Sequence, residues 1–101
     1  MIYSLSELRD KEVINVENGE KLGYIDDVEF EAEKERIAAF VIYGRKRFGG
    51  LFGRENDLII ACRQIELIGN DTVLVRINTR DCERKTKSFR FGIENLLNHT
   101  N

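Results

Sequence analysis

The sequence lacks the features of a membrane-spanning, secreted or disulfide-stabilised protein. No apolar run approaches the ~20 residues that a membrane-spanning helix needs. The first residues, M-I-Y-S-L-S-E-L, lack the basic start and the long apolar stretch of a secretory signal. The two cysteines, Cys62 and Cys82, form neither a Cys-x-x-Cys pair nor a disulfide framework. We therefore expect a protein of the reducing cytoplasm that has no membrane span.

Histidine is nearly absent, which removes most metal-binding and catalytic arrangements. His99 is the single histidine, and a zinc site needs three or four convergent ligands. Cys62 and Cys82 do not stand at motif spacing from it, so we predict no metal and no cofactor. We expect Cys62 at a buried strand edge and Cys82 in the tail. A Ser/His/Asp or Cys/His arrangement would depend on this one histidine near the C-terminus, which is poor preorganisation.

The adjacent carboxylates Asp26 and Asp27 are the remaining candidates for catalysis. Neighbouring side chains on a regular strand point to opposite faces of the sheet, so these two would not converge. No partner that could act as a general base is visible. We interpret the pair as solvated carboxylates at a β-bulge. The sequence thus predicts no catalytic residue and a protein that is not an enzyme.

Proline is also absent, so no strand edge is protected by one. What remains is a pattern of short β-strands. The segment Val13–Phe30 predicts two strands joined at Asn18-Gly19, because both turn residues tolerate the positive φ of a tight hairpin. The second strand changes phase at Asp26-Asp27, which indicates a bulge or bend. A hairpin that bends this early favours a small closed barrel over a flat sheet.

These patterns predict an all-β fold, a small barrel of about six strands with a short N-terminal helical turn and a possible C-terminal helix. Ser4 and Glu7 have capping-box spacing, which predicts a helical turn over Leu5–Arg9. The predicted strands are 12–16, 22–31, 37–43, 58–61, 65–68 and 72–77. The expected core consists of Val13, Ile14, Val16, Leu22, Ile25, Val28, Phe30, Ala39, Val41, Ile60, Ile65, Leu67, Val73 and Val75.

The strand 37–43, I-A-A-F-V-I-Y, is apolar on both faces and therefore needs cover on both sides. The barrel interior covers one face. Either the C-terminal segment or a second subunit covers the other, and the second alternative predicts a homo-oligomer. We divide the chain into a barrel over residues 1–77 and a polar linker with a tail over 78–101. Apolar residues three or four apart make the tail either an amphipathic helix or a disordered end.

A long loop at Gly44–Asn56 carries the candidate interaction residues. Four cations surround two phenylalanines there, without the glycine-lysine motif of a nucleotide-binding loop. The segment could pack over the end of the barrel. It could contact another protein, since arginine and aromatic residues are enriched at interface centres, or bind phosphates and stack on unpaired bases. The candidate partner-binding residues are Arg45, Lys46, Arg47, Phe48, Leu51, Phe52 and Arg54.

Several short motifs follow one another along the chain: L-R-D-K-E-V-I at 8–14, N-G at 18–19, L-G-Y-I-D-D-V at 22–28, G-L-F-G-R at 50–54 and I-E-L-I-G-N-D-T-V-L-V at 65–75. Their order and spacing resemble the PRC-barrel family, and within it the small stand-alone sporulation-associated proteins of the YlmC/YmxH type. Members commonly have a Pro-aromatic pair where this chain has Ala61-Cys62, so the packing at that corner is expected to differ.

The resemblance implies a compact β-barrel that acts as an interaction module and carries no enzymatic activity. Such barrels occur in a ribosome-maturation factor that engages a ribosomal protein and in the photosynthetic reaction-centre H subunit. We therefore predict a cytoplasmic, non-enzymatic protein-interaction or assembly module. The resemblance suggests sporulation as the process in which it acts. The alternative is an RNA- or ribosome-associated protein that uses the same loop and the basic segment 84–87. The sequence pI of about 5.5 counts mildly against that alternative.

Overall fold

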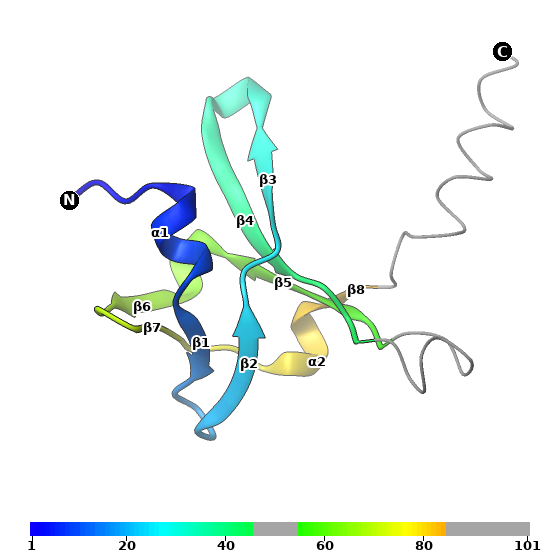
Figure 1. Cartoon of the computed structure of the whole chain (residues 1–101). Helices are drawn as coiled ribbons and strands as arrows, with labels where there is room; N and C mark the ends of the chain where they lie inside the picture. The colour runs from blue at the N-terminus through cyan, green and yellow to red at the C-terminus, as the bar shows by residue number, and fades with distance from the viewer. Residues whose placement is uncertain (46–54, 85–101) are drawn as a thin grey trace, which may run out of the picture.

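The computed structural model describes residues 1–45 and 55–84, and these residues form a mostly β structure with two short helices (Figure 1). The prediction of an all-β fold is confirmed. In chain order the elements are α1 (Leu5–Arg9), β1 (Glu12–Asn15), β2 (Glu20–Tyr24), β3 (Asp27–Glu31), the 3-10 turn η1 (Ala32–Lys34), β4 (Arg36–Ile42), β5 (Asp57–Ala61), the 3-10 turn η3 (Cys62–Gln64), β6 (Ile65–Ile68), β7 (Thr72–Val75), α2 (Thr79–Cys82) and β8 (Glu83–Arg84).

The strands form two four-stranded sheets, in the orders β2-β1-β7-β6 and β3-β4-β5-β8. Strands β1 and β7 are parallel, and the other neighbours are antiparallel. The chain passes from one sheet to the other three times, between β2 and β3, through η3 between β5 and β6, and through α2 between β7 and β8. The first crossing occupies Ile25 and Asp26, where the sequence pattern predicted a bend. These three crossings join the sheets around one shared core.

Local signals in the sequence account for the N-terminal helix and the first turn. The Ser4 hydroxyl accepts a hydrogen bond from the Glu7 amide at 3.1 Å, and the Glu7 carboxylate accepts one from the Ser4 amide at 3.4 Å. This reciprocal cap satisfies amides that the first turn leaves unpaired. At the predicted hairpin turn, Gly19 has a φ of 73° and its amide donates to the Asn15 carbonyl at 2.7 Å. The predicted helical turn and the hairpin are confirmed, but the hairpin connection spans residues 16–19, and of its two predicted turn residues Gly19 has a positive φ and Asn18 does not.

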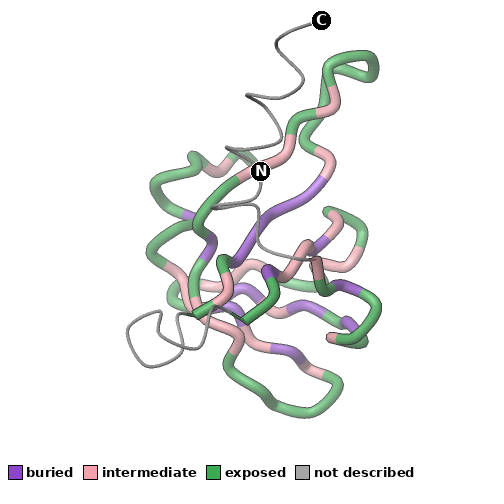
Figure 2. Tube along the Cα trace, turned by 90° about the vertical axis from the view of Figure 1, so that its right-hand side faces the viewer, coloured by how far each residue is buried: buried purple, intermediate pink, exposed green. Residues whose placement is uncertain are grey.

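The core lies between the two sheets (Figure 2). Four predicted core residues, Ile14, Val16, Phe30 and Leu67, are not part of it, and Ala39 and Val41 are buried outside its main cluster. Phe30 follows the alternation of β3, but the β3–β4 hairpin projects past the core and leaves this ring 64% exposed. Leu67 is 58% exposed because the β6–β7 register shifts between Ile65 and Leu67. The buried apolar residues are Leu8, Val13, Ile25, Ala39, Phe40, Val41, Ile42, Ile60, Val73, Val75, Ile77 and Cys82.

The chain beyond β7 was expected to be a polar linker, but as far as Arg84 it forms α2 and β8. The Asn78 side chain caps α2 by accepting a hydrogen bond from the Arg80 amide at 3.1 Å. The predicted environments of the two thiols were wrong. Cys82 is buried in the core, because α2 packs against β5, and Cys62 is exposed.

Candidate interaction surface

An ion pair crosses the outer face of the β3-β4-β5-β8 sheet from one edge to the other. Arg84 on β8 binds Glu29 on β3 through both guanidinium nitrogens, with Nη2 3.1 Å from Oε1 and Nη1 on Oε2. Glu29 is the register partner of Ala39, so the pair lies on the face that also carries Val41. Both β4 residues are buried on this face, while their neighbours in β4 belong to the main core. Arg84 belongs to the segment 78–101, so this segment contributes a side chain to the face for which we expected cover from the tail or a second subunit.

A second pair of side chains lies on the same face. The Tyr43 hydroxyl donates a hydrogen bond to Asp27 Oδ2 at 3.1 Å. This bond, followed by burial and the nearby carboxylates, raises the pKa of Tyr43 above its ordinary value. The hydrogen bonds that Arg84 donates to Glu29 raise the pKa of Arg84, and burial has a smaller effect that lowers it. Both contacts hold charged or polar groups flat against the sheet.

The base of the 44–56 loop is tightly constrained. The Glu55 amide donates to the Arg45 carbonyl at 2.8 Å, so the β4–β5 ladder continues past the end of both strands. The Gly44 amide donates to Asp57 Oδ1 at 2.7 Å, and the Asp57 carboxylate is buried. A Cβ on Gly44 would lie 1.7 Å from the Glu55 carbonyl oxygen. The backbone segments at Gly44 and Glu55 approach so closely that no residue other than glycine fits at position 44 without rearrangement.

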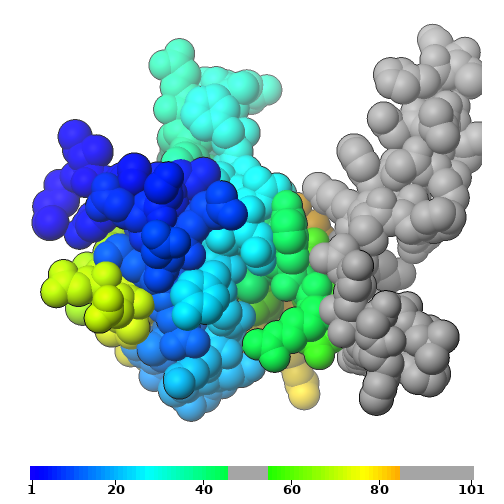
Figure 3. Space-filling view, viewed as in Figure 1, coloured from blue at the N-terminus to red at the C-terminus, as the bar shows by residue number. Residues whose placement is uncertain are grey.

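A groove of about 700 Å³ runs along this loop base. Figure 3 shows the blue surface of β2 and the green surface of the loop base on the same face of the molecule. The described residues that line the groove come from β2, the two ends of the loop, β5, α2 and β8. They are Glu20, Lys21, Leu22, Gly23, Tyr24, Asp26, Ile42, Tyr43, Gly44, Arg45, Glu55, Asn56, Leu58, Thr79 and Glu83.

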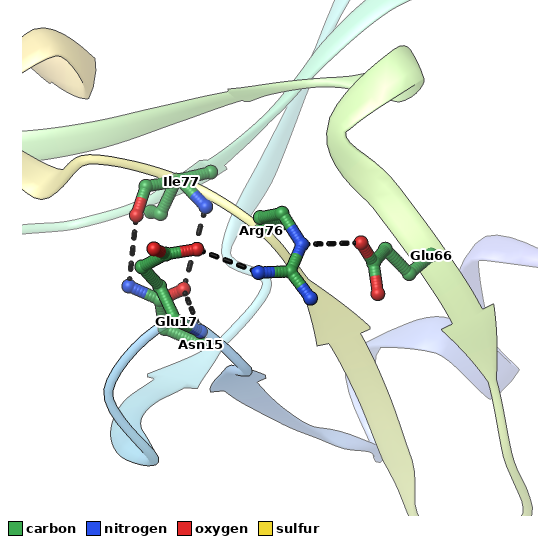
Figure 4. Close-up of polar contacts among 5 residues, drawn as sticks. All are labelled: Asn15, Glu17, Glu66, Arg76 and Ile77. Atoms are coloured by element: carbon green, nitrogen blue, oxygen red, sulfur yellow. Dashed lines mark hydrogen bonds and ion pairs between the residues drawn. The ribbon is translucent and has the colours of Figure 1, made fainter.

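A polar network on the other sheet ties the barrel together instead of forming a site (Figure 4). The buried Asn15 side chain donates to the Ile77 carbonyl at 3.0 Å and accepts from the Ile77 amide at 3.3 Å. Arg76 bridges Glu66 and Glu17, each at 2.6 Å. The hydrogen bonds that Arg76 donates raise its pKa, the bond to Glu66 having the largest effect and the bond to Glu17 the next. Since Asn15 ends β1, these contacts join β1 to the chain that follows β7.

The structure places the first of the predicted partner-binding residues. Arg45 is exposed at the base of the loop. The other six, Lys46, Arg47, Phe48, Leu51, Phe52 and Arg54, lie outside the described residues, as does the predicted C-terminal helix. Asp26 and Asp27 both accept from Tyr43, but from different groups: Asp26 Oδ2 accepts from the Tyr43 amide at 2.7 Å and Asp27 Oδ2 from the Tyr43 hydroxyl at 3.1 Å, while Asp27 Oδ1 accepts from the Val28 amide at 2.8 Å.

Within residues 1–45 and 55–84, no group of three or more His, Cys, Asp or Glu side chains could hold a metal ion. In the same part of the chain, no helix is long and apolar enough to cross a membrane. Sequence reasoning missed the groove carboxylates Glu20, Glu55 and Glu83 and the Arg84–Glu29 pair. These residues are far apart in the sequence and carry no motif, so the sheet order alone brings them together.

Comparison with known proteins assigns the family. The model of the PRC-barrel domain matches residues 1–81. This chain belongs to the PRC-barrel family. The match confirms the resemblance that the motifs suggested, and the two sheets and their shared core are the PRC-barrel fold of this chain.

Two relatives extend this result. The "probable sporulation protein YlmC" of Bacillus subtilis (strain 168) is 41% identical over 77 residues, which are 76% of this chain and 95% of that protein. An uncharacterized protein of Clostridium acetobutylicum is 34% identical over 73 residues, 72% of this chain and 83% of that protein. Neither relative carries the name of an enzyme.

Proposed function

We propose that this PRC-barrel protein is a cytoplasmic, non-enzymatic protein-interaction or assembly module that binds its partner through the Arg45–Arg54 loop and the adjoining groove. The observation that carries the proposal is the constrained loop base. The Glu55–Arg45 bond, the Asp57–Gly44 bond and the close backbone contact at Gly44 hold both ends of the loop on the barrel. A fixed base reduces the ordering entropy that binding through a loop would otherwise cost.

The composition of the loop supports a protein partner. It presents arginines beside Phe48, Leu51 and Phe52, and arginine and aromatic side chains dominate the centres of protein interfaces. The groove beside it adds the exposed Tyr24 and Tyr43. The relative named as a probable sporulation protein suggests the process, and we extend that role to this chain as part of the proposal.

A double substitution, Phe48→Ala with Phe52→Ala, tests the proposal. Proteins captured from the native cell lysate by the tagged chain are compared for the wild type, this variant and a control, Leu67→Ala, which removes an exposed apolar side chain from the other sheet. We expect the double variant to fold and to lose a partner that the control retains, with binding that survives ribonuclease. A folded double variant that retains every partner would refute the loop as the contact surface.

An RNA- or ribosome-associated function is the second candidate, and one observation favours it. Strand β8 pairs with Asp57 and Leu58, next to the loop base, so the described part of the chain ends at Arg84 beside the base of the basic loop, and basic residues follow Arg84 in the sequence. Binding dominated by phosphate contacts falls steeply with salt. Capture that disappears with ribonuclease and with moderate salt would select this function over a protein contact.

Self-association is a separate proposal, because a second copy of the chain is one of the partners that the loop could bind. Equilibrium sedimentation of the wild type and the Phe48→Ala, Phe52→Ala variant measures it directly. A concentration-dependent dimer that the double variant abolishes would support self-association through the loop. A monomer at all concentrations would refute it.

A further inference from the structure

We propose that the C-terminal segment of this chain, residues 85–101, folds back on its own barrel and binds the groove between β2 and the base of the 44–56 loop. This inference goes beyond the proposed function, because it assigns an intramolecular ligand to the surface that a partner would use. The argument has three parts: where the segment starts, which side its residues face, and what the groove offers them.

The segment starts at the rim of the groove. In the antiparallel β5–β8 pair, Glu83 lies opposite Leu58 and Arg84 opposite Asp57. The next positions along β5 in this register are Asn56 and Glu55. Both line the groove, as does Glu83. A chain that continued β8 by a few residues would therefore run directly along the groove wall.

The alternation of a strand then decides which side chains face the groove. Glu83 lines the groove, whereas Arg84 lies on the outer face of the sheet, where it is fixed by Glu29. Since successive side chains on a strand point to opposite faces, an extended continuation places every second residue after Glu83 on the groove side. These residues are Lys85, Lys87, Phe89 and Phe91. Both lysines and both phenylalanines of the segment thus share one face.

The groove complements the two lysines. Four carboxylates line it, from Glu20, Asp26, Glu55 and Glu83, against two cations. None of the four forms an ion pair with a residue that the structure describes. Opposite charges that are partly shielded from water attract each other more strongly than fully solvated ones. Lysines that enter this groove would therefore be stabilised by carboxylates that pair with no cation among residues 1–45 and 55–84.

The groove also complements the two phenylalanines. Tyr24 and Tyr43 line it and are 50% and 46% exposed, and the half-buried Leu22 and Leu58 lie in the same wall. Aromatic side chains gain both from burial of their large surface and from edge-to-face contacts with other rings. From Lys85 to Phe91 an extended chain covers roughly 20 Å, which is enough to cross a groove of this size.

Paramagnetic relaxation in the full-length chain tests the docking. A nitroxide is attached to Asn95→Cys in a chain that also carries Cys62→Ser, because Cys62 is the exposed native thiol and Cys82 is buried. Serine keeps the hydrogen bond that the Cys62 thiol donates to the Ile37 carbonyl. We expect amide signals of β2 and of Glu55 to lose at least half of their intensity. Amide signals of β6, which forms the opposite edge of the sheet that contains β2, should keep their intensity.

Two matched double variants test the register. Lys85→Gln with Lys87→Gln and Thr86→Glu with Ser88→Glu each lower the net charge by two. The first changes the predicted groove side and the second the opposite side. We expect the first to restore the β2 signals and the second to leave the broadening in place. Equal effects of the two, or no selective broadening of β2 in the wild-type tail, would refute the proposal.

A mixed sample separates docking within one chain from docking between chains. Spin-labelled chains without ¹⁵N are combined with ¹⁵N chains that carry no label. Broadening of β2 in this mixture would show that a second copy supplies the segment, which would overturn intramolecular docking. An unbroadened mixture, together with broadening in the singly labelled sample, is the result we expect.

Discussion

Replacing Gly44 by alanine tests whether the loop base is as constrained as the structure indicates. The added Cβ would lie 1.7 Å from the Glu55 carbonyl oxygen and 2.4 Å from its carbonyl carbon, whereas real Cβ contacts essentially never fall below 3.0 Å. The obstacle is backbone, so no rotamer change relieves it. The backbone segments at residues 44 and 55 must separate by about 1.3 Å, the difference between 3.0 and 1.7 Å. That movement pulls the Gly44 amide away from Asp57.

Three contributions set the expected loss of unfolding free energy. Forcing apart packed chains costs about 1–3 kcal/mol. Weakening the bond from the Gly44 amide to the buried Asp57 carboxylate costs about 1.5–3 kcal/mol more. Alanine returns about 0.4–1 kcal/mol by restricting the unfolded chain. The net loss is ~2–5 kcal/mol, which leaves a typical small domain of ~5–15 kcal/mol folded but clearly weakened.

Urea unfolding, followed by circular dichroism, measures this loss for the wild type, Gly44→Ala and Gly69→Ala. Gly69 is the matched control, because its added Cβ would lie 3.4 Å from the Thr72 hydroxyl and needs little adjustment. We expect the control within ~0.5 kcal/mol of the wild type. A Gly44→Ala protein as stable as the Gly69→Ala protein would show that the loop base is not closely packed, and the support for the proposed function would be lost with it.

Two further predictions concern the polar groups of the two sheets. Asn15→Ala leaves the buried amide and carbonyl of Ile77 without partners, so we expect a loss of about 2–4 kcal/mol in the same urea assay, against a much smaller loss for Asn18→Ala in the exposed turn. The hydrogen bond to Asp27 raises the pKa of Tyr43 in the folded protein above 10.0. The stability that this bond contributes is therefore complete below about pH 10 and is lost as the pH rises through the pKa of Tyr43 in the folded protein. Tyr43→Phe should therefore make the decline in stability above pH 10 shallower, and an unchanged slope would contradict the assignment.

The sequence predicted the elements whose signals are local. The Ser4–Glu7 cap, the turn at Gly19 and the bend at Asp26 each depend on a few neighbouring residues, and all three are found where the pattern placed them. Burial was less predictable because it depends on distant elements. Alternation along the strand predicted a buried Phe30, but the side chain is exposed because the hairpin extends beyond the core.

The candidate site was predictable in part. Composition singled out the basic-aromatic loop, and Arg45 at its base is exposed. The groove and the pair formed by Arg84 and Glu29 could not be foreseen, since they require knowledge that β8 returns to the edge of β5. A two-residue strand has no periodicity that a sequence pattern could reveal. The expected linker and the position of Cys82 were misjudged for the same reason.

The absence of proline gives the edge of β3 a particular significance. A strand edge without proline has to discourage unwanted pairing by other means, and charged side chains are one of them. Strand β3 reads D-V-E-F-E, with carboxylates at Asp27, Glu29 and Glu31, and Glu29 and Glu31 form ion pairs with Arg84 and Arg36, so a strand that added to this edge would lie beside a row of charged side chains. At the opposite edge, β8 already occupies part of β5. Both edges of this sheet thus disfavour partner binding by strand addition, which supports the proposal that a partner binds the side chains of the loop and its groove.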